Sequence, residues 1–286
     1  MSLEDEVVAL LKDQGLTLTT AESCTAGLLA GRVMNVAGAS AVYEEGYITY
    51  SNKAKEKLLG VCHDTLERYG AVSRETACEM AEGAAKAAGA DAALVVTPYY
   101  NKATQNGLIA HYTDIAKHID LPIILYNVPS RTGCKLEAAT IAKLVKDVDN
   151  IVGVKEATGD IAFATQIMYD TQGDIDMYSG NDDMIVPMLS IGGKGVISVL
   201  SNVAPEDTHN ICAEYFAGNV EKSRELQIKY LELIHSLFCE VNPIPVKKAL
   251  ELMGFYGGNV RLPLTQLEPA HTERLKKAMI ETGILA

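Results

Sequence analysis

Lys155 is the residue of this sequence whose type and position point most directly to chemistry. It closes the apolar run 151–155, and the turn-like segment 156–159 follows at once, a pattern that predicts a buried strand ending in a turn. An amine at the edge of an apolar core is desolvated, which lowers its pKa and leaves part of it neutral and nucleophilic. A Schiff-base enzyme requires such an amine, although a lysine at a strand end more often extends into water.

Five short apolar runs, separated by stretches of helical periodicity, make up the second part of the chain. The runs lie at residues 92–96, 122–126, 151–155, 175–179 and 195–199. Helical patterns fill the gaps, for example at 107–118 and 136–148, and two or three amphipathic helices are expected after the last run, through Ile280. Strands that alternate with helices every ~20 to 30 residues predict parallel β/α units. The predicted fold class is therefore α/β, of (β/α)8-barrel type.

Polar residues follow these runs at the ends that would converge on the C-terminal rim of a barrel, where active sites lie. Tyr100 follows the first run and Tyr126 closes the second, while Gly180 and Asn181 follow the fourth. Asn, Asp, Ser and Gly at such positions are most often turn or cap residues. Tyrosine and lysine have no such routine use, so Tyr100, Tyr126 and Lys155 are the candidates for chemistry.

Composition excludes several classes of protein. The chain has 286 residues, 48% hydrophobic and 22% charged, as in an ordinary globular protein. A net charge of −12 without a basic run argues against a nucleic-acid surface. No apolar stretch approaches membrane-spanning length, and the start is not a signal peptide. Six cysteines without a C-x-x-C pair or a histidine at ligand spacing predict no disulfide framework and no metal site, which fits the cytoplasm.

The first ninety residues follow a different pattern. Helices are expected at 3–14, 23–34, 53–59 and 73–88, and short strands at 16–21 and 42–51. The second strand has hairpin character, and Ser73 is the expected N-cap of the last helix. Because this part contains no matching β/α repeat, we expect a boundary near the end of that helix, with one segment at 1–88 and the other at 89–286.

Residues from about 90 onward resemble the dihydrodipicolinate synthase family of lysine-dependent class I aldolase-type enzymes. The resemblance rests on six segments in the family's order: 96–101 (VTPYYN), 125–133 (LYNVPSRTG), 152–159 (VGVKEATG), 178–182 (YSGND), 195–199 (GVISV) and 242–247 (NPIPVK). It implies a (β/α)8 barrel and a lyase that condenses pyruvate with aspartate semialdehyde in the diaminopimelate route of lysine biosynthesis. It also implies a homodimer or homotetramer, and no cofactor, because a lysine itself holds pyruvate as an imine.

The resemblance implies a role for each matching residue. Lys155 would form the imine with pyruvate, and Tyr126 would relay protons, as a phenol on a neighbouring strand can. Arg131 would hold the carboxylate of the aldehyde partner, because its planar fork matches a carboxylate. The sister sialic-acid lyases differ around Tyr126, and residues 130–133 favour the synthase branch.

Three further residues receive positions from the same resemblance. Gly180 and Ile197 would line the pyruvate pocket, and Tyr100 would reach into the site of a neighbouring subunit. The family also begins with three β/α units, which include a Gly-Thr-Thr-Gly-Glu-Ser loop, and none of these is recognisable in this chain, where the CinA-like segment stands in place of the three units. The lost threonine predicts a rate deficit of about 10²–10⁴, the usual size of a general acid–base contribution.

The first part resembles the CinA C-terminal family of nicotinamide-nucleotide amidases, at 19–27 (TTAESCTAG), 46–55 (GYITYSNKAK) and 70–73 (GAVS). In that family Ser23, Ser40, Tyr50 and Lys55 would fall at or near the site. A serine activated by a nearby lysine can hydrolyse an amide. The glycine-rich loop that continues this family is replaced by the synthase-like segment, so the chain has the pattern of a chimera.

The segment that contains Thr20 also imitates the synthase family's lost threonine loop. It could place Thr20 beside Tyr126, but it lies about 80 residues before Tyr100 and follows the first expected strand rather than the second. Helix-start Ser and Thr are common caps in any case, and the CinA-like ancestry already accounts for the segment.

Three hypotheses for function follow. The first is the pyruvate–aspartate semialdehyde synthase, which covers about two thirds of the chain; feedback by lysine is not expected, because that site lies largely in the missing part. The second is a nucleotide amidase, and the third is a folded chimera without activity. Five strands cannot close a barrel alone, so closure would need strands from the first part or from a partner chain.

Overall fold

The computed structural model describes residues 91–257, 260 and 262–285 and, nearer the N-terminus, residues 8, 11, 17–22, 30, 33–34, 36, 38–43, 46–71, 73, 75–76, 79–80 and 83–84. The chain forms two compact units. The first contains Met1–Asp91 and Lys117–Leu121, and the second contains Ala92–Ala116 and Pro122–Ala286. No helix within the described residues is long and apolar enough to cross a membrane.

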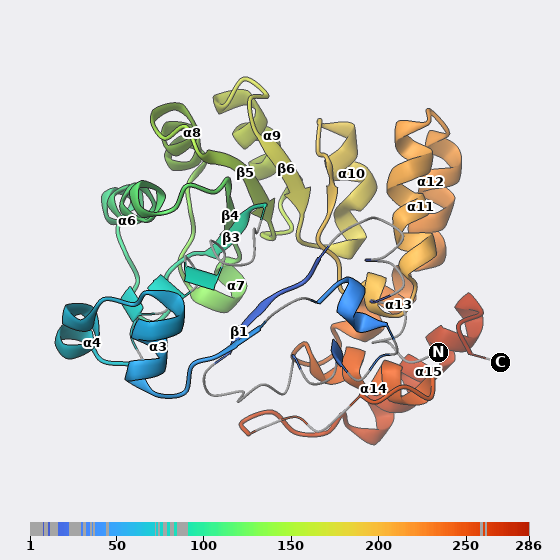
Figure 1. Ribbon diagram of the computed structural model, residues 1–286. Helices are drawn as coiled ribbons and strands as arrows, with labels where there is room; N and C mark the ends of the chain where they lie inside the picture. The colour runs from blue at the N-terminus through green and yellow to red at the C-terminus, as the bar shows by residue number, and fades with distance from the viewer. Residues whose placement is uncertain are drawn as a thin grey trace. The chain divides into compact units, whose positions relative to one another are not determined.

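A five-stranded parallel sheet is the centre of the second unit (Figure 1). Its strands are β3 (Ala93–Val96), β4 (Ile123–Asn127), β5 (Ile151–Glu156), β6 (Asp176–Ser179) and β7 (Gly195–Val196). They lie in chain order, and each pairs in parallel with the next. Each of the five runs therefore contains a strand, although the fifth, expected at 195–199, is a strand only at Gly195–Val196, and the parallel α/β prediction is confirmed.

Helices follow the strands and cover one face of this sheet. They are α6 (Gln105–His118), α8 (Ala138–Asp147), α9 (Ile161–Asp170) and α10 (Ile185–Ser190); the one-turn helix α7 (Pro129–Thr132) directly follows β4, and a 3-10 turn η2 lies at Asp182–Met184. Alternate side chains on the covered face, Leu125, Val154 and Met177, are fully buried. Asp160 starts α9 by accepting the amide protons of Ala162 and Phe163 at 2.9 and 3.0 Å.

The C-terminal part of this unit is more helical than the two or three expected helices. After the 3-10 turn η3 (Leu200–Asn202), the described chain forms α11 (Pro205–Phe216), α12 (Val220–Lys229), α13 (Leu231–Leu237), α14 (Ile244–Leu252) and α15 (Pro269–Thr282). The periodicity of α12 runs into that of α13, because only Tyr230 separates them. Leu233, Leu237 and Leu275 are fully buried, so these helices have an apolar core of their own.

The N-terminal unit contains two strands, β1 (Thr20–Glu22) and β2 (Gly46–Ile48), which pair in parallel. The expected hairpin character of residues 42–51 is therefore wrong. Parallel strands need a long crossover connection, and the intervening chain includes helical residues at 30 and 33–34 and the 3-10 turn η1 (Ala39–Ala41). The strand is also limited to three residues.

Two helices follow β2 in the N-terminal unit. The first is α3 (Asn52–Leu59), which begins where Ser51 Oγ accepts the amide proton of Ala54 at 3.2 Å, and which confirms the helix expected at 53–59. The second, α4 (His63–Tyr69), was not expected. Further along, Ser73 Oγ accepts the Thr76 amide proton at 3.2 Å, as its capping role requires.

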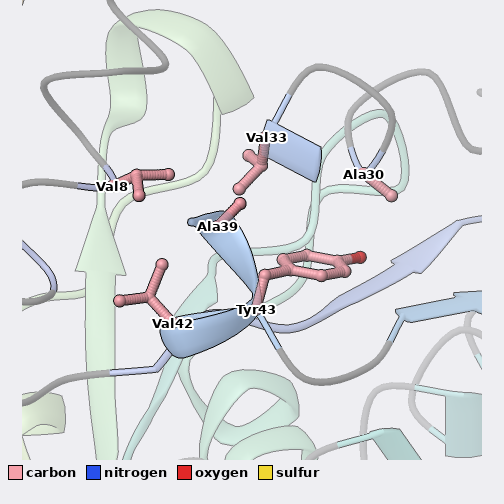
Figure 2. Packing of buried hydrophobic residues seen from close by; sticks show 6 residues of the cluster. All are labelled: Val8, Ala30, Val33, Ala39, Val42 and Tyr43. Atoms are coloured by element: carbon pink, nitrogen blue, oxygen red, sulfur yellow. The ribbon is translucent and has the colours of Figure 1, made fainter. Parts of the chain in front are cut away.

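Two apolar clusters stabilise the N-terminal unit. Figure 2 shows the first, which contains Val8, Ala30, Val33, Ala39, Val42 and Tyr43. The second contains Leu59, Val61, Leu66 and Ala84. Both join helical and loop residues far apart in sequence, and the burial of such side chains is the main source of stability for short elements.

Candidate active site

The register of the parallel sheet places Tyr126 and Lys155 directly beside each other on neighbouring strands. Tyr126 on β4 is the partner of Lys155 on β5, and Lys155 is in turn the partner of Tyr178 on β6. Lys155 Nζ lies over the Tyr126 ring, 4.2 Å from its centroid. Both side chains are half-buried. The sheet therefore places an amine against a phenol at the C-terminal ends of adjacent strands, as expected from the sequence.

Burial dominates the electrostatics of Lys155. It lowers the pKa of the amine; the carboxylate of Asp182 raises that pKa, and the positive charge of Arg131 lowers it further. The net direction is downward, so a larger fraction of Lys155 is neutral at a given pH than for a lysine in water. A neutral amine in this position is able to attack a carbonyl carbon.

The phenol of Tyr126 is shifted in the opposite sense. Burial raises its pKa, and the charge of Arg131 opposes this effect. Tyr126 therefore keeps its proton at neutral pH, and its hydroxyl is available as a hydrogen-bond donor.

Arg131 lies on the one-turn helix α7, directly after β4. Pro129 starts this helix and Gly133, with a φ of 63°, ends it in the left-handed region that favours glycine. Arg131 is exposed, and its Nη1 donates a hydrogen bond to the Asn242 carbonyl at 3.4 Å. The guanidinium charge affects both Tyr126 and Lys155, so this arm of the site lies within electrostatic range of the reactive pair.

Gly180 and Ile197 lie at the ends of the two strands beyond Lys155. The Gly180 amide donates to the Glu156 carbonyl at 2.7 Å, and the Ile197 amide donates to the Ser179 carbonyl at 2.9 Å. A Cβ at position 180 would lie 2.5 Å from the Cβ of Ala157, so only glycine fits there without a shift. The backbone of Gly180 is therefore fixed against the end of β5, and that of Ile197 against the end of β6.

Asp182 lies near this site, within segment 178–182, and the resemblance to the synthase family implied no role for it. It is buried, and its Oδ2 accepts the amide protons of Val199 and Leu200 at 3.0 and 2.9 Å. Burial raises the pKa of this carboxyl, and its charge acts on Lys155. The signal available in the sequence was an acidic residue three positions after a strand, and such a residue is usually a turn or cap residue.

Tyr100 has an unusual backbone for its type. Its φ is 62°, in the left-handed region that a bulky residue rarely adopts, and its side chain is 90% exposed. Such strain persists only where the surrounding structure holds it, and it concentrates at functional positions. Tyr100 is not a register partner of Tyr126 or Lys155, because it lies four residues after the end of β3.

The amidase-type candidates occupy different environments in the N-terminal unit. Ser23 lies outside the described residues. Ser40 is exposed in η1 and Tyr50 is 74% exposed, whereas Lys55 on α3 is only 1% exposed. Lys55 Nζ donates to the Thr49 carbonyl at 2.5 Å. Their expected roles stay predictions.

Thr20, the possible substitute for the family's lost threonine, is buried on β1. Its hydroxyl forms a 2.7 Å hydrogen bond with the hydroxyl of Tyr43 in the same unit. The expectation that Thr20 serves Tyr126 likewise stays a prediction.

Two family models match this chain. The dihydrodipicolinate synthetase family matches residues 54–282. The CinA C-terminal domain matches residues 1–101. Because the first match covers most of the chain, the protein belongs to the dihydrodipicolinate synthetase family. Both resemblances seen in the sequence are confirmed, and the two matches overlap at residues 54–101.

Individual relatives agree with this assignment. A 4-hydroxy-tetrahydrodipicolinate synthase of Lachnoclostridium phytofermentans is 55% identical over 216 residues, which are 76% of this chain and 73% of the relative. The crystal structure of dihydrodipicolinate synthase from Thermotoga maritima is 42% identical, with a TM-score of 0.71 over 82% of this chain and 83% of that one. A dihydrodipicolinate synthase from Acinetobacter baumannii in complex with pyruvate is 34% identical, with a TM-score of 0.73 over 99% of this chain and 92% of that one. The predicted (β/α)8-barrel fold class is confirmed by these matches.

Proposed function

We propose that this chain is a Schiff-base lyase that condenses pyruvate with aspartate semialdehyde, the reaction of a 4-hydroxy-tetrahydrodipicolinate synthase. The observation that carries the proposal is the contact of Lys155 Nζ with the Tyr126 ring at adjacent strand ends. It is supported by the downward shift in the pKa of the amine and by family membership. The reaction belongs to the diaminopimelate route of lysine biosynthesis.

The first chemical step uses Lys155 as the nucleophile. Its neutral amine attacks the keto carbon of pyruvate, and loss of water gives an imine with the lysine nitrogen. Loss of a proton from the pyruvate methyl group then gives an enamine, whose carbon attacks the aldehyde carbon of the second substrate. The iminium nitrogen is the electron sink, so the proposed reaction needs no cofactor.

Tyr126 and Arg131 have separate tasks in this scheme. The protonated phenol of Tyr126 hands a proton to the departing hydroxyl during imine formation and takes it back later. The exposed guanidinium of Arg131 binds the carboxylate of aspartate semialdehyde in a bidentate way. Gly180 and Ile197 line the pyruvate pocket, where the absence of a Cβ at 180 leaves the β6 end close to β5.

Tyr100 leads to a proposal about assembly. A tyrosine that is 90% exposed with a positive φ is an unfavourable arrangement for an isolated chain. We propose a homodimer or homotetramer in which the Tyr100 side chain enters the site of a second copy.

The lost threonine of the family's relay leaves the proposed rate below that of complete relatives by about 10²–10⁴.

Borohydride trapping tests the proposed function. The protein is incubated with pyruvate, reduced with sodium borohydride, and analysed by intact mass and peptide mapping. We expect a pyruvyl-sized adduct on Lys155 and no adduct in Lys155→Gln. The control variant Lys194→Gln, at the lysine that directly precedes β7, should keep the adduct. A folded protein without an adduct on Lys155 would falsify the Schiff-base proposal and favour the inactive chimera.

The match to the CinA C-terminal domain favours a second candidate, hydrolysis of the amide of nicotinamide mononucleotide. The observation that supports it is the burial of Lys55 in the N-terminal unit, because a lysine near a serine can activate the serine hydroxyl. Release of ammonia from nicotinamide mononucleotide, lost in Lys55→Ala, would support this activity; no release would remove it.

The cysteines in the described part of the chain are free thiols, which supports a place in the cytoplasm.

A further inference from the structure

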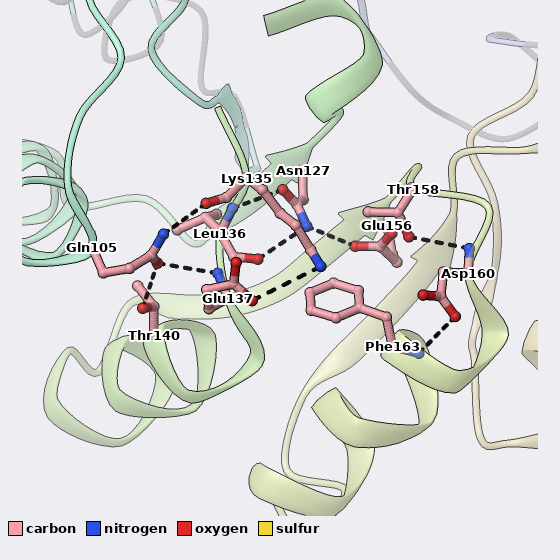
Figure 3. Close-up of polar contacts among 10 residues, drawn as sticks. All are labelled: Gln105, Asn127, Lys135, Leu136, Glu137, Thr140, Glu156, Thr158, Asp160 and Phe163. Atoms are coloured by element: carbon pink, nitrogen blue, oxygen red, sulfur yellow. Dashed lines mark hydrogen bonds and ion pairs between the residues drawn. The ribbon is translucent and has the colours of Figure 1, made fainter. Parts of the chain in front are cut away.

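A second pair of side chains lies directly beyond the reactive pair. Asn127 and Glu156 are register partners at the ends of β4 and β5, one residue after Tyr126 and Lys155. Because side chains alternate along a strand, this second pair lies on the opposite face of the sheet. Both side chains are buried, and Asn127 Nδ2 donates to Glu156 Oε2 at 2.9 Å (Figure 3). A side-chain hydrogen bond thus joins the two strands next to the reactive pair.

The remaining polar atoms of this pair hold the neighbouring loops. Asn127 Oδ1 accepts the amide proton of Leu136 at 3.0 Å, in the segment that follows Arg131. Glu156 Oε1 accepts the amide proton of Thr158 at 2.6 Å, in the turn before α9. Figure 3 shows the Asn127 amide between Leu136 on one side and the Glu156 carboxylate on the other. The pair therefore connects the Lys155 strand to the segment after the Arg131 helix.

Burial of a carboxylate between two strands costs free energy, because the charge loses its contact with water. Burial raises the pKa of Glu156, while the hydrogen bonds from Thr158 and Asn127 and the nearby Lys135 lower it. Apolar side chains of similar volume often stabilise a protein core as well as a buried polar pair does. Such groups are better explained by the unique geometry that they impose than by stability alone.

We propose that Asn127 and Glu156 are positioning residues that hold Tyr126 and Lys155 at the separation needed for imine formation. The kinetic part of this inference rests on the proposed Schiff-base function. The hydrogen bond fixes the two strand ends on the helix-covered face, and the reactive side chains are placed by the same two backbones. A displacement of about 1 Å between reacting groups can cost ~10²-fold in rate.

An exchange of polarity separates positioning from packing. Glu156→Gln sets an amide against the Asn127 amide, and Asn127→Asp sets a carboxylate against the Glu156 carboxylate. The double variant N127D/E156Q restores one donor and one acceptor in reversed order. In it, the new side chain at 156 still has an oxygen for the Thr158 amide, and the one at 127 still has an oxygen for the Leu136 amide. The double variant lacks only the 3.4 Å hydrogen bond from Asn127 Nδ2 to the Leu136 carbonyl, which Asn127→Asp lacks as well. All variants have nearly the same volume.

The experiment measures the rate of borohydride-trapped pyruvate adduct at saturating pyruvate. We expect each single variant to lower the rate about 10–100-fold, with the half-saturating pyruvate concentration unchanged within about threefold, and the double variant to recover wild-type behaviour. Ser223→Ala is the matched control, because it removes another fully buried hydrogen bond, from Ser223 Oγ to the Ile211 carbonyl at 2.6 Å. It should lower the thermal midpoint without changing the rate.

Two outcomes contradict the inference: folded single variants with an unchanged trapping rate, or a folded double variant that stays as slow as the singles. If one single variant does not fold, the other single and the double variant carry the same comparison. A second measurement is independent of catalysis. Acetylation of Lys155 by acetic anhydride, relative to the exposed Lys276, should rise about threefold or more in each single variant and return in the double variant.

The second measurement also separates two possible failures. A wild-type protein that forms no pyruvate adduct, but whose Lys155 labelling responds to the variants as expected, would remove the proposed function and leave the positioning pair in place. Labelling that is the same in all folded variants would overturn the positioning inference, whether or not the adduct forms.

Discussion

Both units of the molecule contain parallel strands, yet they present their candidate residues in different ways. In the five-stranded sheet, Tyr126 and Lys155 are direct register partners at adjacent strand ends. In the N-terminal unit, Ser40, Tyr50 and Lys55 come from a turn, a strand end and a helix, and their exposure ranges from open to fully buried. A site on strand ends takes its geometry from the hydrogen-bonded ladder, whereas a site assembled from loops needs each loop to be fixed separately.

The largest expected effect comes from removing the nucleophile of the sheet. Lys155→Ala should lower the synthase rate by more than about 10³-fold, because the covalent path through the imine is lost. Pyruvate-dependent consumption of aspartate semialdehyde measures it. The buried lysine of the other unit gives the comparison: Lys55→Ala should leave the trapping of pyruvate on Lys155 intact. Equal loss in both variants would show that the two units cannot be treated separately.

Arg131→Gln should have the next largest effect, and it should divide between the two substrates. Loss of a charge-assisted hydrogen bond should raise the half-saturating concentration of aspartate semialdehyde about 10–100-fold. Arg131 also lowers the pKa of Lys155. Without it that pKa rises, the neutral fraction at a given pH falls, and the pH profile of pyruvate trapping moves to higher pH. A profile that stays in place would show that Arg131 does not act on the amine.

Gly180→Ala tests how tightly the sheet fixes the site. The new Cβ would lie 2.5 Å from Ala157 Cβ, so the β6 end must move, and we expect about 1–3 kcal/mol of lost stability. Gly107→Ala is the control, because its Cβ would meet only ordinary contacts at 3.4 Å inside α6. That variant should gain about 0.5–1 kcal/mol from helix propensity. Denaturant unfolding of both proteins decides whether the signs are opposite.

The smallest expected effect concerns the N-terminal unit. Tyr43→Phe removes the hydrogen bond to Thr20 and should cost about 0.5–1.5 kcal/mol of stability. The rate of pyruvate trapping on Lys155 should not change. If trapping slows markedly in folded Tyr43→Phe protein, the Thr20 hydroxyl pair contributes to the site of the sheet. That result would support the prediction that Thr20 replaces the family's lost threonine.

Most strands of the second unit could be predicted because they are apolar runs closed by turn residues, although β6 itself contains Asp176 and Ser179. The strand that carries Lys155 begins at Ile151, as expected. It ends at Glu156, one residue beyond the expected end at Lys155. The hairpin expected around Tyr47 was wrong, because local sequence does not reveal which distant strand will be its partner. The number of C-terminal helices was underestimated for a similar reason, since a single residue, Tyr230, ends one helix and begins the next.

Some parts of the candidate site could not be predicted at all. Asp182 is buried and accepts the amide protons of Val199 and Leu200, and its charge acts on Lys155 from a remote part of the chain. The hydrogen bond between Asn127 and Glu156 depends on the register of β4 with β5, since the two residues are 29 positions apart. Neither residue type in isolation distinguishes a positioning group from a turn or cap residue.

By itself, the sequence determined the residue types available for chemistry, the strands that carry them and the family to which the chain belongs. These depend on local patterns and on short motifs read in order. The tertiary structure decided which of these residues meet: it set Lys155 against Tyr126, gave Tyr100 its strained backbone and brought Asp182 within range of the amine. The physical reason is that desolvation and Coulomb interactions depend on distances between atoms from remote parts of the chain.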